Sequence, residues 1–140
     1  MLGHPLHPAL VHFPIGLLLS ATLADLAWAI GLTGDVHIGA VMMAGGLCAG
    51  LLAMGAGMFD LTRLAPETVP HAVRHMTVMG LAWLGYAIAL YLRRDVFSGG
   101  AAIGMASVWA SLISAALLAL GGWLGGRLVY TFGAGVSNKH

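Results

Sequence analysis

Charge is scarce in this sequence. Only 8% of its 140 residues are Asp, Glu, Lys or Arg, whereas 59% are hydrophobic. Soluble proteins are about a quarter charged, because a surface that faces water needs polar cover. The composition therefore excludes a water-soluble domain, and most of the surface of this protein must face lipid.

Basic stripes and paired cysteines are also missing. The six basic residues are scattered singly apart from Arg93 and Arg94, so we expect no nucleic-acid partner. The single cysteine, Cys48, forms no disulfide framework and no covalent haem-attachment motif. The metalloprotease, serine-hydrolase and phosphate-loop motifs are absent too, which leaves little support for catalysis by a stand-alone enzyme.

Long apolar runs dominate the sequence. A membrane helix needs about 20 mostly apolar residues to cross a hydrocarbon core of about 30 Å. Four segments meet this length, so the sequence predicts an all-α integral membrane protein: a four-helix transmembrane bundle forming a single domain over residues 1–140. We expect the helices roughly at residues 12–30, 38–59, 71–92 and 101–124. Pro14 and Pro70 are expected in the first turns of the first and third helices.

Glycine is abundant, with 21 residues. Gly46 and Gly50, and likewise Gly121 and Gly125, have the small-xxx-small spacing that lets helices approach closely in lipid. These pairs predict tight helix packing, either within the chain or in a homodimer.

An even number of spans places both termini and the connection near residues 60–74 on one membrane face. Arg63, Arg74, Arg127 and Lys139 lie on this termini face, whereas Arg93 and Arg94 lie on the opposite face. The positive-inside rule then favours cytoplasmic termini by four basic residues to two. If Arg74 and Arg127 have a functional role, the count becomes two to two.

Histidines give the strongest functional signal. Five of the seven fall on the termini face: His4, His7, His12, His71 and His75. His71 and His75 are four residues apart and so share one helical face. A neutral imidazole ligates iron, copper or zinc, and two imidazoles from different helices are the usual axial pair of a b-type haem.

The ends of the chain carry the more specific motifs. These are Gly3-His4-Pro5-Leu6-His7-Pro8 with Val11-His12-Phe13-Pro14, and Gly122-Trp123-Leu124-Gly125-Gly126-Arg127 after the last span. In these motifs, and in the pair His71 and His75, the chain resembles the bacterial four-helix membrane proteins called domain of unknown function 2231. The resemblance covers nearly the whole chain, and the layout also resembles small transmembrane cytochromes b.

The resemblance implies redox work in the bacterial inner membrane, because family members are sometimes fused to Rieske-type or c-type cytochrome modules. Such modules act outside the cytoplasmic membrane, so it favours termini that face out. It also implies roles for His4, His7, His12, His71, His75 and Arg127. Either His12 and His75 or His12 and His71 are expected as axial ligands of haem b, with Arg74 and Arg127 near the propionates.

Three functions remain open. The first is a haem protein that passes electrons between a quinol or other membrane donor and a redox partner. The second is a protein that binds or transports zinc or copper with the five histidines, joined by Asp60 or Glu67. The third is a structural or assembly subunit with merely interfacial histidines. Asp25, inside the first span, is expected to be a helix-end carboxylate or a proton-handling group with a partner or water.

Overall fold

Four long helices make up most of the computed structural model, which describes residues 6–132, with side chains from Leu10 onward. The helices are α1 (Leu6–Ala29), α2 (His37–Leu61), α3 (Val69–Leu92) and α4 (Met105–Phe132), and a short 3-10 helix η1 (Arg94–Ser98) follows α3. No strand occurs between residues 6 and 132. The predicted all-α class is therefore confirmed.

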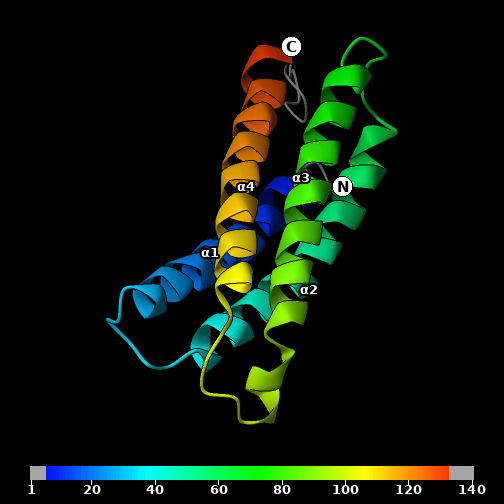
Figure 1. Cartoon of the computed structure of the whole chain (residues 1–140). Coiled ribbons are helices and arrows are strands. Elements are labelled where there is room, and N and C mark those ends of the chain that lie inside the picture. The colour runs from blue at the N-terminus through cyan, green and yellow to red at the C-terminus, as the bar shows by residue number, and fades with distance from the viewer. Residues whose placement is uncertain (1–5, 133–140) are drawn as a thin grey trace.

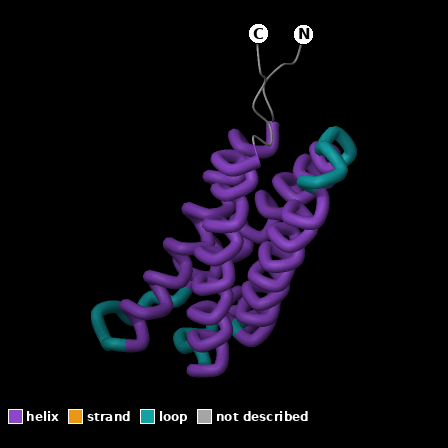
Figure 2. Tube along the Cα trace, turned by 90° about the horizontal axis from the view of Figure 1, so that it is seen from above, coloured by secondary structure: helices purple, strands orange, loops and turns teal. Residues whose placement is uncertain are grey.

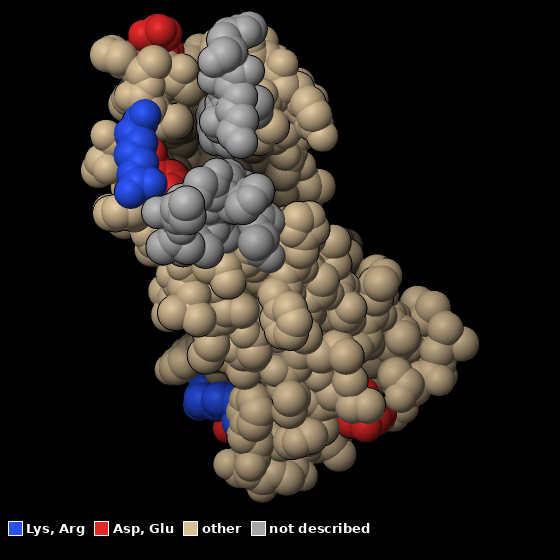
Figure 3. All heavy atoms as spheres, turned by 180° about the vertical axis from the view of Figure 1, so that it is seen from behind, with Lys and Arg blue, Asp and Glu red and all other residues tan. Residues whose placement is uncertain are grey.

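Each of the four α-helices is long and apolar enough to cross a membrane. Large apolar side chains cover the outside of the bundle, as Phe13, Leu52 and Ile113 illustrate with exposed fractions of 72%, 70% and 61%. Figure 3 shows a broad uncharged band on one face of the molecule, with basic and acidic side chains near its two ends. This surface suits a bilayer, and the predicted integral membrane bundle is confirmed.

The helices pack as two antiparallel hairpins, α1 with α2 and α3 with α4. Figure 1 shows the α1–α2 hairpin crossing obliquely behind the α3–α4 hairpin. Figure 2 shows the α2–α3 connection at one end of the bundle and the other two connections at the opposite end. The start of α1 and the end of α4 therefore share the termini end with the α2–α3 connection.

A central apolar core joins the two hairpins. Leu18 of α1, Met43 of α2 and Tyr86 of α3 are buried there, with Ala82 and Leu118 beside them. The indole Nε1–H of Trp83 donates to the backbone oxygen of Leu47 over 3.0 Å, which ties α3 to α2. A smaller apolar cluster around Val36, Val96 and Ile103 closes the opposite end.

The predicted bounds of two helices, the first and the last, are wrong. The last helix runs from Met105 to Phe132 rather than over 101–124, because its glycine-rich run is stabilised by packing against α3 and Leu128 beyond it is buried. The first helix begins at Leu6 rather than near residue 12, so Pro14 lies inside it and not in its first turn. Pro70 does lie in the first turn of α3.

Both glycine pairs pack against other helices of the same chain. A Cβ atom on Gly46 would lie 2.7 Å from Leu18 Cγ, and one on Gly50 would lie 3.1 Å from Trp83 Cδ1. On α4, a Cβ on Gly121 would strike Met79, and one on Gly125 would lie 2.9 Å from His75 Cε1. The spacing thus brings α2 against α1 and α3, and α4 against α3, while the homodimer stays a prediction.

The adjacent pair Gly45 and Gly46 offers a test of this packing. We expect Gly46→Ala to lower the melting temperature of the detergent-purified protein, because overpacking a core costs about 1–3 kcal/mol. Gly45→Ala is the matched control: its Cβ would make only an ordinary 3.6 Å contact with Leu17. Alanine also favours a helix over glycine by up to about 1 kcal/mol. Equal melting temperatures for the two variants would contradict the close approach at Gly46.

Candidate functional site

A buried ion pair joins the two hairpins near the end opposite the termini. The guanidinium of Arg93 donates from Nη1 and Nη2 to the two carboxylate oxygens of Asp25, over 2.5 and 2.6 Å. The two side chains are 0% and 2% exposed. Neither group reaches water, and an unpaired charge in this position would cost several kcal/mol. The two-point contact avoids this cost because each group neutralises the other.

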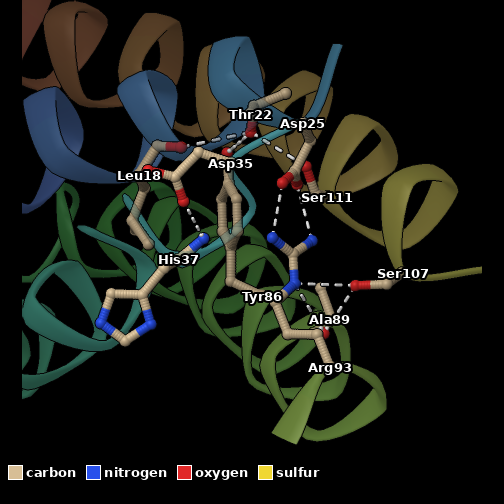
Figure 4. A network of polar contacts seen from close by, with 10 residues as sticks. All are labelled: Leu18, Thr22, Asp25, Asp35, His37, Tyr86, Ala89, Arg93, Ser107 and Ser111. Atoms are coloured by element: carbon tan, nitrogen blue, oxygen red, sulfur yellow. Dashed lines mark hydrogen bonds and ion pairs between the residues drawn. The ribbon is translucent and has the colours of Figure 1, made fainter. Parts of the chain in front are cut away.

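The third nitrogen of the Arg93 guanidinium is also hydrogen-bonded. Its Nε–H donates to the hydroxyl of Ser107 over 2.9 Å and to the backbone oxygen of Ala89 over 3.3 Å. Ser107 in turn donates to the same Ala89 oxygen over 2.7 Å. Figure 4 shows the guanidinium lying between Asp25 on one side and Ser107 on the other.

A second group of hydroxyls lies beside the ion pair. Thr22 on α1 and Tyr86 on α3 share a hydrogen bond of 2.8 Å, and Ser111 on α4 donates to Thr22 over 3.2 Å. On α2, a Cβ on Gly39 would lie 3.3 Å from an Asp25 oxygen, so glycine lets this helix approach the carboxylate. All four helices therefore meet around one polar core, which we call the Asp25–Arg93 core.

The sequence located only half of this core. Asp25 was expected to need a partner or water, and its partner is Arg93, which was counted among the basic residues of the opposite face. Both residues lie near the ends of predicted spans on that same face. A search for opposite charges at matching depth in different spans could have found the pair.

At the termini end, His75 lies half-buried between α3 and α4. Its Nδ1 is 2.8 Å from the backbone oxygen of Gly121, one turn before Gly125, which packs on the same ring. A carbonyl oxygen only accepts hydrogen bonds, so Nδ1 carries the proton and, in the neutral ring, Nε2 carries the lone pair. This arrangement orients the imidazole rigidly.

His71, one turn earlier on α3, has different surroundings. Its ring stacks on Phe132 with a centroid distance of 4.2 Å and an interplanar angle of 27°. It also lines a pocket of about 150 Å³ between α3 and α4, which we call the arginine pocket. Its walls are His71, Arg74, Leu124, Arg127, Leu128 and Phe132. The structure thus gathers three of the predicted site residues in one hollow.

His12 lies on α1 and is exposed. The predicted positions His4 and His7 lie outside the described side chains. Among the side chains that are described, no group of three or more His, Cys, Asp or Glu gathers in a way that could hold a metal ion. The histidine assignments therefore stay predictions, and Asp60 and Glu67 form no such group with His71 and His75.

Comparison with known proteins gives one family. The sequence profile of a family described as predicted membrane proteins, domain of unknown function 2231, matches residues 3–138. The chain belongs to this family. No curated protein and no solved structure matches the chain. This family member is a predicted membrane protein with four apolar spans, consistent with a multi-pass arrangement in a lipid bilayer.

A quantitative prediction about stability follows from the Asp25–Arg93 core. We expect Asp25→Leu and Arg93→Leu each to destabilise the protein by about 3–5 kcal/mol, because each leaves one buried charge without its partner. The double variant should recover a large part of this loss. Unfolding of the detergent-purified protein, followed by circular dichroism, measures these differences.

Arg94→Leu is the matched control, because Arg94 is exposed and its Nε lies 3.9 Å from Asp95. An exposed pair of this kind contributes about 1 kcal/mol or less. The buried ion pair does not stabilise the fold if Arg93→Leu is no more destabilising than Arg94→Leu. The same conclusion follows if the double variant loses as much stability as the Asp25→Leu and Arg93→Leu variants together.

Proposed function

We propose that this family member is a membrane-bound b-type haem protein that carries electrons, with His75 as one axial ligand. The contact between His75 and the backbone of Gly121 carries the proposal. Histidines that bind metals almost always donate their other ring N–H to a carboxylate, a backbone carbonyl or water, which fixes the tautomer and orientation. His75 has this second contact, and its Nε2 is the nitrogen that would bind iron.

The environment of His75 favours it over His71. Gly125 leaves space for the ring between α3 and α4, whereas the His71 ring is stacked on Phe132 and lines the arginine pocket. A rigid, half-buried imidazole is better suited to hold a metal in one geometry than a ring at the edge of an open hollow. The pair His12 and His75 is therefore the preferred axial pair.

His12 is proposed as the second ligand because α1 begins at the same end of the bundle. Gly50 of α2 lies between Trp83 of α3 and Pro14 of α1, so the first half of α1 packs on α2 at the level where α2 contacts α3. Trp83 follows His75 by about two helical turns. Two ligands are enough for a haem, so the proposal needs no cluster of three metal-binding groups.

A bound haem would supply a one-electron iron couple, and the chain would set its orientation and surroundings. Apolar side chains of the bundle would exclude water from the ring. Arg74 and Arg127, at the same end, are the residues proposed to face its propionates. A quinol or another membrane donor and a soluble redox protein are the proposed partners.

The absorption spectrum tests this proposal. We expect the protein, produced with sufficient haem and purified in detergent, to show a strong Soret band that shifts on reduction with dithionite. His75→Ala and His12→Ala should each remove most of this band or convert it to a five-coordinate type, because an axial nitrogen is lost.

His37→Ala is the control: His37 is exposed at the opposite end, where its ring lies 6.0 Å from that of Phe97. It should leave the spectrum unchanged. Haem-replete protein without a Soret band would refute the haem function, and elemental analysis for zinc and copper would then test the second function.

The burial of Arg93 also bears on orientation. The Arg93 side chain is buried and paired with Asp25, so it is not a basic residue of the connecting loop. Arg94 alone then represents the opposite face in the positive-inside count. The count then favours the termini face even without Arg74 and Arg127, through Arg63 and Lys139. We therefore propose cytoplasmic termini in a bacterial inner membrane, against the outward orientation that the family resemblance favoured.

Cysteine labelling tests the orientation. In a background with Cys48→Ala, Ser98→Cys marks the α3–α4 end and Glu67→Cys marks the termini end; both positions are exposed. A membrane-impermeant maleimide applied to intact cells should label the Ser98→Cys protein and not the Glu67→Cys protein. Permeabilised cells, in which both should react, provide the control. The reverse labelling pattern would establish outward-facing termini.

A further inference from the structure

The arginine pocket has a strong excess of positive charge. Two of its six lining residues are arginines, Arg74 from α3 and Arg127 from α4, and no carboxylate lines it. Among the described residues, the ion pairs are Arg93 with Asp25 and Arg94 with Asp95, so neither pocket arginine is neutralised by a described acidic side chain. Two arginines that line one hollow provide a site for an oxyanion, because each guanidinium presents a planar fork of N–H donors.

The rest of the pocket wall is apolar. Leu124 and Leu128 line it from α4, and the stacked rings of His71 and Phe132 close one side. A ligand for this hollow therefore combines an anionic group with hydrocarbon. At about 150 Å³, the pocket is below the roughly 300–1,000 Å³ of sites for drug-sized molecules, so it fits a head group rather than a porphyrin ring.

A second hollow of about 280 Å³ continues onto the outer face of α4. It is lined by Trp123, Gly126, Arg127, Tyr130 and Thr131, and its lining is mainly apolar. Arg127 belongs to both hollows, and its guanidinium lies 5.2 Å from the centre of the Trp123 ring. Trp123 and Tyr130 are exposed, as aromatic side chains typically are where a protein meets the membrane–water interface.

We propose that the arginine pocket binds the phosphate head group of an acidic phospholipid, with the adjoining hollow on α4 receiving the start of its hydrocarbon portion. Arg74 and Arg127 bind the phosphate oxygens, and Trp123 and Tyr130 pack against the glycerol and upper acyl region. The site is an alternative to the propionate role proposed above for the two arginines, and it requires neither haem nor an axial histidine.

Lipid-dependent stability tests the proposal. The full chain is purified in a mild detergent, stripped of lipid, and melted with added phosphatidylglycerol or phosphatidylcholine. We expect phosphatidylglycerol to raise the wild-type melting temperature by several degrees more than phosphatidylcholine does, because a ligand that binds only the folded state stabilises it. In Arg74→Gln/Arg127→Gln this difference should fall by roughly half or more. Both arginines are exposed, so the variant is expected to fold.

Arg63→Gln controls for general attraction to anionic lipid. Arg63 is exposed at the same end, over the Phe59 ring at 4.4 Å, and does not line the pocket. It should keep the full phosphatidylglycerol effect. An equal reduction in Arg63→Gln and in the pocket variant would overturn the proposal, as would a wild-type protein that does not distinguish the two lipids.

Two further measurements separate other sources of the same anionic chemistry. Inorganic phosphate alone should produce little stabilisation; a shift as large as that from phosphatidylglycerol would assign the pocket to a free anion and overturn the lipid site. The Soret band of the pocket variant decides between the two roles of the arginines: loss of the band with an unchanged lipid preference would assign them to haem propionates and overturn the lipid site. If no haem binds at all, the lipid measurement still stands by itself.

Discussion

The contact between Asp25 and Arg93 determines how the two hairpins meet. Lipid offers no hydrogen bonds, so a charged side chain in the spanning region must find its partner inside the protein. Here the carboxylate comes from α1 and the guanidinium from the end of α3, while Ser107 of α4 and Gly39 of α2 complete their surroundings. Apolar contacts between helices are interchangeable with contacts to lipid chains, whereas this two-point polar contact is not. It therefore fixes which helices are neighbours and at what depth.

The four membrane-spanning helices could be predicted from the sequence, because apolar runs of this length are typical of membrane spans. Sequence reasoning failed at the ends of α1 and α4, where Pro14 and the glycines near position 122 suggested boundaries that tertiary packing overrides. It identified His71, Arg74 and Arg127, which the structure places in one pocket. It did not find the backbone oxygen of Gly121 as the partner of His75, because a main-chain contact between two helices leaves no mark in residue types.

The two ends of the bundle differ in chemistry. At the end opposite the termini, Arg93 is neutralised by Asp25 and Arg94 lies near Asp95, so little net charge remains. At the termini end, Arg63 and Arg127 lie over aromatic rings, and Arg74 lines a pocket without a described acidic partner. The residues proposed to bind anions, metals and lipid head groups are thus concentrated at one membrane face, whereas the Asp25–Arg93 core lies near the other.

The order in which the chain is made gives the Asp25–Arg93 contact a further meaning. The two residues are 68 positions apart in sequence. At about 5–20 residues per second, several seconds separate the synthesis of the acidic residue from that of its basic partner. During this interval the first hairpin has a carboxyl group with no guanidinium to meet, and that group must stay near water or accept a proton. Burial of the ionised carboxylate therefore waits for the third helix, so the final packing of the first hairpin depends on a later part of the chain.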